Sequence, residues 1–506
     1  MLLYILILGF IPVRRLRRLL FAASFFVSLL LGGVEFFSIV QYSSLIGAGI
    51  VTAVLQTNPR EAGEFVRMYV GWKGVVAAVL LVVAGVFTYR RLGAVRIPFL
   101  SRHRLSLAIP LVVVASLAAG GILLTRYYSF IINDSLDVPV VRVGRAATTS
   151  VENIRAFEKL KEEAVADVDI AENHSDTPYV VFILGESTTR DRMHLYGYPL
   201  ENTPNLDELN VKGDLAVFRD TISPESATVA VLRKLLTFAD MDSSKPWYAY
   251  NNMIDTMKAA GYRTYWLSNQ ESSGIWGNVA QLFAGRSDYS RFTRLRESHE
   301  DSGIYDEALF PLVDEALQSP VPKNFYLIHL MGGHGLYYMR FPYIFSKFTA
   351  DDVPPPQDEL SQEKRTEIAQ YENALYYNDF IVTSLMGKFA DKDALVVYIP
   401  DHGEALYDRG STFSGHIEEH PTKETLEVPM IFWASPAYKA HHPEKWQALR
   451  AAVNRPYMTD DFIHTLLDLL DIRTPEYDPR KSVINPAFQP RAHRMVQGHD
   501  YDTEMK

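Results

Sequence analysis

The sequence predicts an α/β protein in which a multispan helical membrane anchor, residues 1–130, precedes a globular domain, residues 178–506, with a mainly parallel sheet covered by helices. Long apolar runs fill the first 130 residues, and short apolar runs alternate with helical patterns after residue 178. The charge of the chain also changes near residue 130. Residues 1–130 hold three acids and thirteen Lys and Arg, which leaves 57 acids, 37 bases and a formal charge of −20 beyond them.

Composition excludes several classes of site and partner. An acidic domain of this kind is a poor nucleic-acid binder, because phosphate backbones are held by Lys and Arg. The chain has no Cys, so disulfides and thiolate metal sites are both excluded. Any metal must therefore be held by oxygen and imidazole ligands.

The anchor is predicted to contain three full spans. Residues 19–40 form an apolar run with one charge, Glu35, and residues 74–89 and 105–124 form two runs without charge. About 20 apolar residues are enough to cross a bilayer. Residues 1–13 are apolar but too short, so we expect a partial span there.

The positions of the arginines predict the orientation of the spans. Arginines cluster before the first full span and between the second and third, which makes both segments cytoplasmic under the positive-inside rule. Residues 41–72 and everything after Thr125 would then lie outside, in the periplasm of a Gram-negative cell. We expect a multi-pass protein of the inner membrane with residues 131–177 as a linker.

The domain after the linker is predicted to consist of βαβ units. Its predicted strands are residues 179–184, 262–267, 325–330, 395–399 and 430–433. The carboxyl ends of parallel strands meet at one edge of the sheet, where ligands bind in open α/β folds.

Carboxylates and imidazoles follow these strands. Glu186 ends the first strand, His334 follows the third, and Asp401 and His402 follow the fourth, with His416 further along the chain. Alone, each could be a helix cap, a loop charge or a core histidine. Together they suit a divalent metal such as zinc at the sheet edge.

Thr228 is a candidate nucleophile at the start of a predicted helix, residues 229–238. A helix start favours an anion, and a threonine hydroxyl attacks only when a metal or base activates it. An ordinary helix cap is the alternative, since Thr and Ser commonly fill that position. The sequence leaves both interpretations open.

These residues resemble the phosphoethanolamine transferases of the alkaline phosphatase and sulfatase superfamily. The resemblance rests on the segments Gly185-Glu-Ser-Thr-Thr-Arg190, Leu195-Tyr-Gly-Tyr-Pro199, Thr203-Pro-Asn205, Ser226-Ala-Thr228, His329-Leu-Met-Gly-Gly-His334 and Asp401-His-Gly-Glu404. It covers nearly the whole chain and implies a zinc-dependent phosphotransferase with an alkaline-phosphatase/sulfatase-like domain.

The resemblance also implies residue roles. Glu186, Thr228, Asp401 and His402 would hold one tightly bound zinc, with Thr228 as nucleophile. His334 and His416 would bind substrate phosphate or a second zinc, with His420 as the competitor for the place of His416. Asn269, Gln270 and His329 are expected to contact substrate, although a lysine expected shortly after Asn269 is not present.

The implied reaction is a transfer of phosphoethanolamine from phosphatidylethanolamine to lipopolysaccharide through a covalent phosphothreonine-type intermediate. Many lipid A-modifying members brace the nucleophile loop with disulfides, whereas this chain has Pro224 where a Cys would be. That difference favours core heptose phosphate over lipid A as acceptor.

A phosphoglycerol transferase or phosphodiesterase acting on a periplasmic glycan is the alternative. A sulfatase is disfavoured because Ser223-Pro-Glu-Ser-Ala lacks the arginine of that motif.

Overall fold

The computed structural model describes residues 14–42, 71–94, 168–271, 279–294 and 304–506, together with scattered positions between 46 and 70 and between 143 and 151. The chain divides into two compact units. One comprises Met1–Val51 and Phe65–Thr149, and the other comprises Thr52–Glu64 and Ser150–Lys506.

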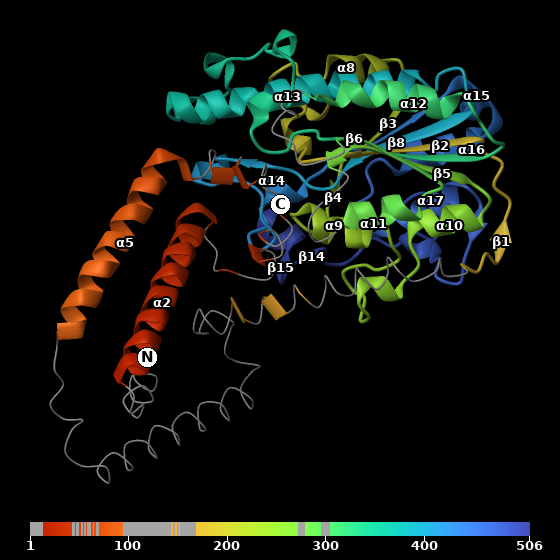
Figure 1. The fold of residues 1–506 in the computed structure, drawn as a ribbon. Coiled ribbons are helices and arrows are strands. Elements are labelled where there is room, and N and C mark those ends of the chain that lie inside the picture. The colour runs from red at the N-terminus through yellow and green to blue at the C-terminus, as the bar shows by residue number, and fades with distance from the viewer. Residues whose placement is uncertain are drawn as a thin grey trace. The chain divides into compact units, whose positions relative to one another are not determined.

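Two long helices form the described part of the first unit, α2 (Arg14–Tyr42) and α5 (Gly71–Ala94) (Figure 1). Gly33 on α2 faces Leu81, and Gly85 on α5 faces Leu29, so small residues let the two helices approach. Within the described residues, Leu19–Ile39 is the one stretch long and apolar enough to cross a membrane, and the apolar part of α5, Gly74–Phe87, is shorter. Two predicted spans are thus helical. The third, at 105–124, and the partial one at 1–13 lie outside the described residues, so the multispan anchor stays a prediction.

A seven-stranded sheet forms the centre of the second unit, in the order β3-β11-β8-β2-β7-β5-β6. Its strands are β2 (Tyr179–Gly185), β3 (Leu215–Phe218), β5 (Arg263–Glu271), β6 (Tyr289–Arg294), β7 (Asn324–His329), β8 (Ala394–Pro400) and β11 (Met430–Ala434). The five strands from β8 to β6 are parallel. Strand β11 runs antiparallel to both β8 and β3, so the sheet is mixed rather than uniformly parallel.

Every predicted strand is present, and the differences concern the two edge strands, β3 and β6, and the direction of β11. Strand β11 was expected among the parallel strands but has the opposite direction. Strands β3 and β6 were not predicted; β3 has four residues, and β6 contains two aromatic residues among four polar ones, so neither is a long apolar run. Central β2 is buried from Val180 onward, which explains its continuous apolar run.

Helices cover both faces of the sheet (Figure 1). One face carries α9 (Thr228–Leu235), α10 (Met253–Ala259), α11 (Val279–Arg286) and α17 (Phe462–Leu469), and the other carries α8 (Pro204–Val211), α12 (Leu309–Leu317) and α13 (Gln362–Gly387). The second unit also contains helices α14 (Lys423–Leu426), α15 (Pro436–His441) and α16 (Pro443–Ala452). Two-residue strands pair as β1 (Glu172–Asn173) with β13 (Ile472–Arg473), β4 (Thr221–Ile222) with β12 (Tyr457–Met458), β9 (Ala405–Leu406) with β10 (Ser414–Gly415), and β14 (Met495–Val496) with β15 (His499–Asp500).

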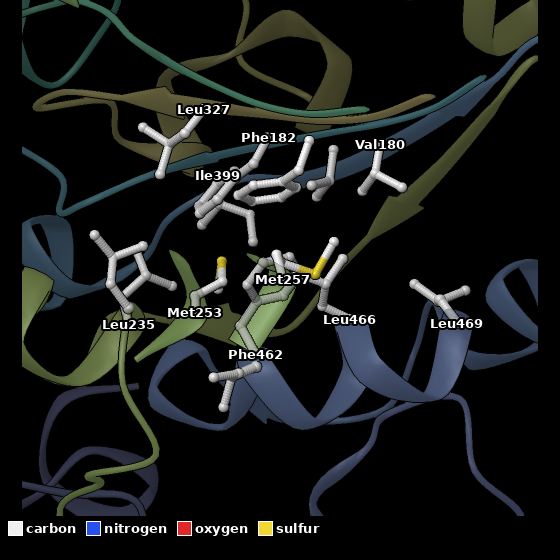
Figure 2. Close-up of a cluster of buried hydrophobic side chains, with 14 of the residues drawn as sticks. Val180, Phe182, Leu235, Met253, Met257, Leu327, Ile399, Phe462, Leu466 and Leu469 are labelled. Atoms are coloured by element: carbon white, nitrogen blue, oxygen red, sulfur yellow. The ribbon is translucent and has the colours of Figure 1, made fainter. Parts of the chain in front are cut away.

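The main core lies between the sheet and the α9–α10–α17 side. Figure 2 shows Phe182 of β2 and Ile399 of β8 facing Met257 of α10 and Phe462 and Leu466 of α17. Each of these five side chains is at most 1 % exposed. This packing fixes strands β2 and β8 side by side, so the residues that follow them emerge together at the carboxyl edge of the sheet.

Candidate metal centre

Three buried candidate ligands, Glu186, Asp401 and His402, converge where β2 and β8 end. The strand register pairs Gly185 with Pro400, so Glu186 and Asp401 follow at the same level. His402 Nε2 lies 3.5 Å from Glu186 Oε1 and 3.4 Å from Asp401 Oδ2. One donor atom from each of the three residues lies within 4.8 Å of the others, a spacing suited to a shared metal ion.

The hydroxyl of Thr228, at the start of α9, also lies next to this cluster. Thr228 is the first residue of α9, and the residue in the cap position is Ala227, which makes no side-chain cap. Thr228 Oγ1 donates to Glu186 Oε2 at 3.2 Å and lies 3.3 Å from His402 Nε2. The side chain therefore faces the metal ligands instead of capping its own helix.

The donor atoms of the cluster are available to bind a zinc ion. Asp401 Oδ1 accepts from the backbone N–H groups of Ser187 and His402, but Oδ2 is buried without a hydrogen-bond partner in the described structure. His402 Nδ1 lies 2.8 Å from Gly403 O, which fixes the proton on Nδ1 and leaves Nε2 as a ligand. Two carboxylates, one imidazole and one hydroxyl make a four-ligand oxygen and nitrogen set.

The buried carboxylates of Glu186 and Asp401 also favour a bound cation. Burial, then repulsion from Asp401, raises the pKa of Glu186 well above its ordinary value. No Lys or Arg in the described part of the chain forms an ion pair with either carboxylate. Buried carboxylates are stable as charged groups only when paired or coordinated to a metal.

A second group lies beside the first and contains His334, Glu404 and His416. His416 Nδ1 lies 2.5 Å from Glu404 Oε2, and Tyr337 Oη donates to Glu404 Oε1 at 2.5 Å. The His416 ring lies 4.0 Å from that of His402 and 6.0 Å from that of His334, centre to centre. Burial lowers the pKa of His416, but the Glu404 carboxylate outweighs burial and leaves the pKa above its usual value.

The second group could bind phosphate or a further cation. Donor atoms of His402, Glu404 and His416 lie within 4.8 Å of one another, as do those of Glu186, His334 and His416. Sequence reasoning assigned no role to Glu404, although the Asp-His-Gly-Glu run places it beside the ligands. His420 instead packs against Phe413, with ring centres 5.3 Å apart, and belongs to neither group.

Of the three predicted substrate contacts, Asn269 and His329 are buried and Gln270 is partly buried. Asn269 is fully buried and its amide binds Asp306 Oδ1 and Thr293 Oγ1, while Gln270 Nε2 donates to Leu330 O. His329 is 1 % exposed, and neither ring nitrogen has a hydrogen-bond partner in the described structure. Burial lowers the pKa of His329 to about 4. Their contact with substrate stays a prediction.

These buried groups hold the loop that carries His334. Asp306, 4 % exposed, accepts from the N–H groups of Met331 and Gly332 at 2.8 and 3.0 Å, as well as from the Asn269 amide. Gly333 N donates to Glu186 O at 2.9 Å. Because Gly332 takes a φ of +49°, the loop turns tightly against the backbone of Glu186.

Comparisons with known proteins identify the family of this chain. The sulfatase family model matches residues 178–472, and the model described as phosphoethanolamine transferase EptA/EptB matches residues 1–135. Phosphoethanolamine transferase EptC of Escherichia coli K12 is 30% identical over 469 residues, which are 89% of this chain and 79% of that protein. Phosphoethanolamine transferase CptA of Salmonella typhimurium is 32% identical over 471 residues, with the same two shares.

Solved structures show the same fold. The periplasmic domain of Escherichia coli EptC in complex with zinc has a TM-score of 0.62 and 31% identity, covering 66% of this chain and 95% of that one. The integral membrane protein EptA of Neisseria meningitidis has a TM-score of 0.68 and covers 96% of this chain and 90% of that one. Its 22% identity limits that comparison to the fold.

Proposed function

Since this chain belongs to the phosphoethanolamine transferases of the sulfatase superfamily and is a phosphotransferase, we propose that it moves phosphoethanolamine from phosphatidylethanolamine to a phosphate of lipopolysaccharide. One observation carries the mechanism. The Thr228 hydroxyl lies within hydrogen-bonding distance of Glu186 and His402, with the unpartnered Asp401 oxygen beside them.

The first half of the reaction forms the covalent intermediate. Thr228 Oγ1 bonds to phosphorus as the bond from phosphorus to the diacylglycerol oxygen breaks. The hydroxyl proton passes to Glu186 Oε2, which already accepts its hydrogen bond, and the diacylglycerol oxygen takes a proton from His416. A zinc ion held by Glu186, Asp401, His402 and Thr228 would lower the hydroxyl pKa and offset charge on the phosphoryl oxygens.

The second half returns the protein to its starting state. An oxygen of the acceptor phosphate attacks phosphorus, and Thr228 Oγ1 leaves with the proton held by Glu186. The acceptor phosphate gives its own proton to His416, whose pKa Glu404 raises above its usual value. His334, on the Asp306-anchored loop, is placed to bind a phosphoryl oxygen.

A position in the inner membrane with the second unit in the periplasm follows from this reaction. The donor is a membrane lipid, and α2 contains a stretch of bilayer length. Periplasmic placement is supported by EptC, whose solved domain is described as periplasmic.

A covalent adduct on Thr228 is the direct test. Purified protein incubated with phosphatidylethanolamine and no acceptor should carry phosphoethanolamine on the peptide that contains Thr228. Thr228→Ala should lose the adduct and the transfer, whereas Thr366→Ala, where the hydroxyl only binds the backbone of its own helix, should keep both. An adduct on Ser223 or Ser226 would refute the assignment, and an adduct from phosphatidylglycerol instead would favour phosphoglycerol transfer.

For the acceptor we propose a core heptose phosphate, supported by the Cys-less nucleophile loop. A related Salmonella typhimurium protein, 26% identical over 314 residues, is named a Kdo(2)-lipid A phosphoethanolamine 7''-transferase, so lipid A is the alternative. Mild acid hydrolysis of lipopolysaccharide separates core from lipid A, and mass spectrometry of each fraction identifies the modified part. Modification confined to the lipid A fraction would refute the core assignment.

A further inference from the structure

The nucleophile loop, residues 223–227, joins β4 to α9 and is held in place without a covalent bridge. Ser223 Oγ donates to Asp401 O at 2.6 Å and to Glu225 O at 2.8 Å. Ser226 Oγ donates to Ile417 O at 2.7 Å. These contacts tie the loop to the segments that carry Asp401 and His416.

Glu225 forms a further attachment of this loop, to Lys234 and Gln497. The residue is 4 % exposed. Its Oε1 lies 2.7 Å from Lys234 Nζ on α9, and its Oε2 accepts from Gln497 Nε2 at 2.8 Å. Gln497 is 272 positions away in sequence, so this bond joins two distant parts of the fold.

Gln497 lies at the turn of the β14–β15 hairpin. Gln497 and Gly498 have φ angles of +49° and +84°, as a type I′ hairpin turn requires. Positive φ is uncommon for a glutamine, and Asn or Asp would be the ordinary choice at this position. The longer side chain is the one that reaches Glu225.

The hairpin is itself fixed to the strand from which the nucleophile loop begins. Val496 and Tyr501 are buried in one cluster with Ile222 of β4, Leu426 and Met458. Arg494, 2 % exposed, pairs with Asp220 at 2.8 Å and Asp502 at 2.6 Å. The turn therefore presents the Gln497 amide from a rigid support.

We propose that the β14–β15 hairpin positions the nucleophile, with Gln497 acting through Glu225 as a positioning residue for Thr228. The inference rests on the proposed function in taking Thr228 as the attacking residue. A hydrogen bond to a carboxylate is charge-assisted and directional, and it fixes the loop three residues before Thr228. Small displacements of an attacking atom are costly, about 100-fold in rate for roughly 1 Å.

Substitutions at the two ends of this bond test the proposal. Gln497→Ala should lower kcat and the rate of adduct formation on Thr228 by about tenfold, the size expected for one charge-assisted hydrogen bond. Gln497→Glu should lower both further, because it sets two carboxylates against each other. Adding Glu225→Gln to Gln497→Glu restores a donor–acceptor pair and should recover part of the rate. Met495→Ala, on the same hairpin and 41 % exposed, is the control and should behave as wild type.

Zinc content, melting temperature and the KM for phosphatidylethanolamine separate positioning from general structure. The proposal expects all three to stay near wild type in Gln497→Ala while kcat falls. A wild-type kcat in Gln497→Ala, no recovery in the double variant, or a loss of kcat matched by equal loss of zinc would each overturn it. If wild-type protein forms no adduct on Thr228, the proposed function fails first, and that result is independent of the hairpin variants.

Discussion

Gly332 offers the sharpest test of how the His334 loop supports the metal centre. A Cβ placed on Gly332 would lie 2.5 Å from Glu186 O and 3.1 Å from Glu186 N, both backbone atoms. Cβ contacts below 3.0 Å are essentially never observed, so Gly332→Ala must separate the loop from the Glu186 backbone by at least 0.5 Å along that contact. Either Glu186 or His334 then leaves its place.

The expected magnitude has two parts. Alanine at positive φ costs about 1 kcal/mol of folding free energy wherever it occurs. Movement of Glu186 adds a specific effect on the metal, and we expect about a 10- to 100-fold loss of zinc affinity, as found when groups supporting a ligand are changed. A similar fall in kcat should accompany the loss of zinc affinity, since Thr228 Oγ1 donates a hydrogen bond to the displaced Glu186 carboxylate.

Gly261→Ala is the matched control for backbone strain. Gly261 has a φ of +85°, but a Cβ there meets nothing within 4 Å. Zinc affinity, measured by competition with a chromogenic chelator, and transfer activity should fall in Gly332→Ala alone, while both variants lose similar thermal stability. Equal zinc affinity in Gly332→Ala and Gly261→Ala would refute the mechanical link between this loop and Glu186.

Three further predictions concern the site and its support. Asp401→Ala should abolish tight zinc binding in metal analysis of the purified protein, and full zinc stoichiometry would contradict the ligand assignment. Asp306→Ala leaves the N–H groups of Met331 and Gly332 without their acceptor, so urea unfolding should show a loss of about 1–3 kcal/mol for each buried donor left unpaired. His329→Leu tests a pH effect: because burial lowers the His329 pKa to about 4, folding stability should fall as pH drops from 6.5 toward 4, by at most about 1.4 kcal/mol per pH unit for one proton. The variant should be less acid-sensitive in urea titrations at pH 7 and pH 5, and an unchanged difference between the two pH values would exclude His329 as a source.

The convergence of Glu186, Asp401 and His402 was predictable because a parallel sheet leaves little choice of position. Apolar runs before Glu186 and Asp401 predict buried strands, and parallel neighbours must end at the same edge. The structure adds the pairing of Gly185 with Pro400, which brings the two carboxylates to one level. The direction of β11 was not predictable in the same way, because an apolar run reads alike in both directions.

The position of Thr228 shows where pattern reasoning ends. A helix cap and a nucleophile both place a threonine at a helix start, so residue types could not separate the two interpretations. The cap position of Ala227 and the 3.2 Å contact with Glu186 argue against the cap, and both depend on how α9 packs on the sheet. The role of Thr228 as nucleophile stays a prediction. Asn269 shows a similar limit: its place in the sequence suggested a substrate contact, its amide donates to Asp306, and contact with substrate stays a prediction.

Charge explains why the metal and the anionic substrates must be recognised together. The chain beyond residue 130 carries a formal charge of −20, and Glu186, Asp401 and Glu404 bring three carboxylates to the site itself. A phosphodiester approaching these groups alone would be repelled. Burial prevents water from screening the repulsion, so attraction has to come from charges within the site. A divalent cation held by Glu186, Asp401 and His402 would reverse the local sign, and Glu404 favours the charged form of His416 because it raises the pKa of that imidazole. The proposed function therefore predicts that donor binding depends on metal binding.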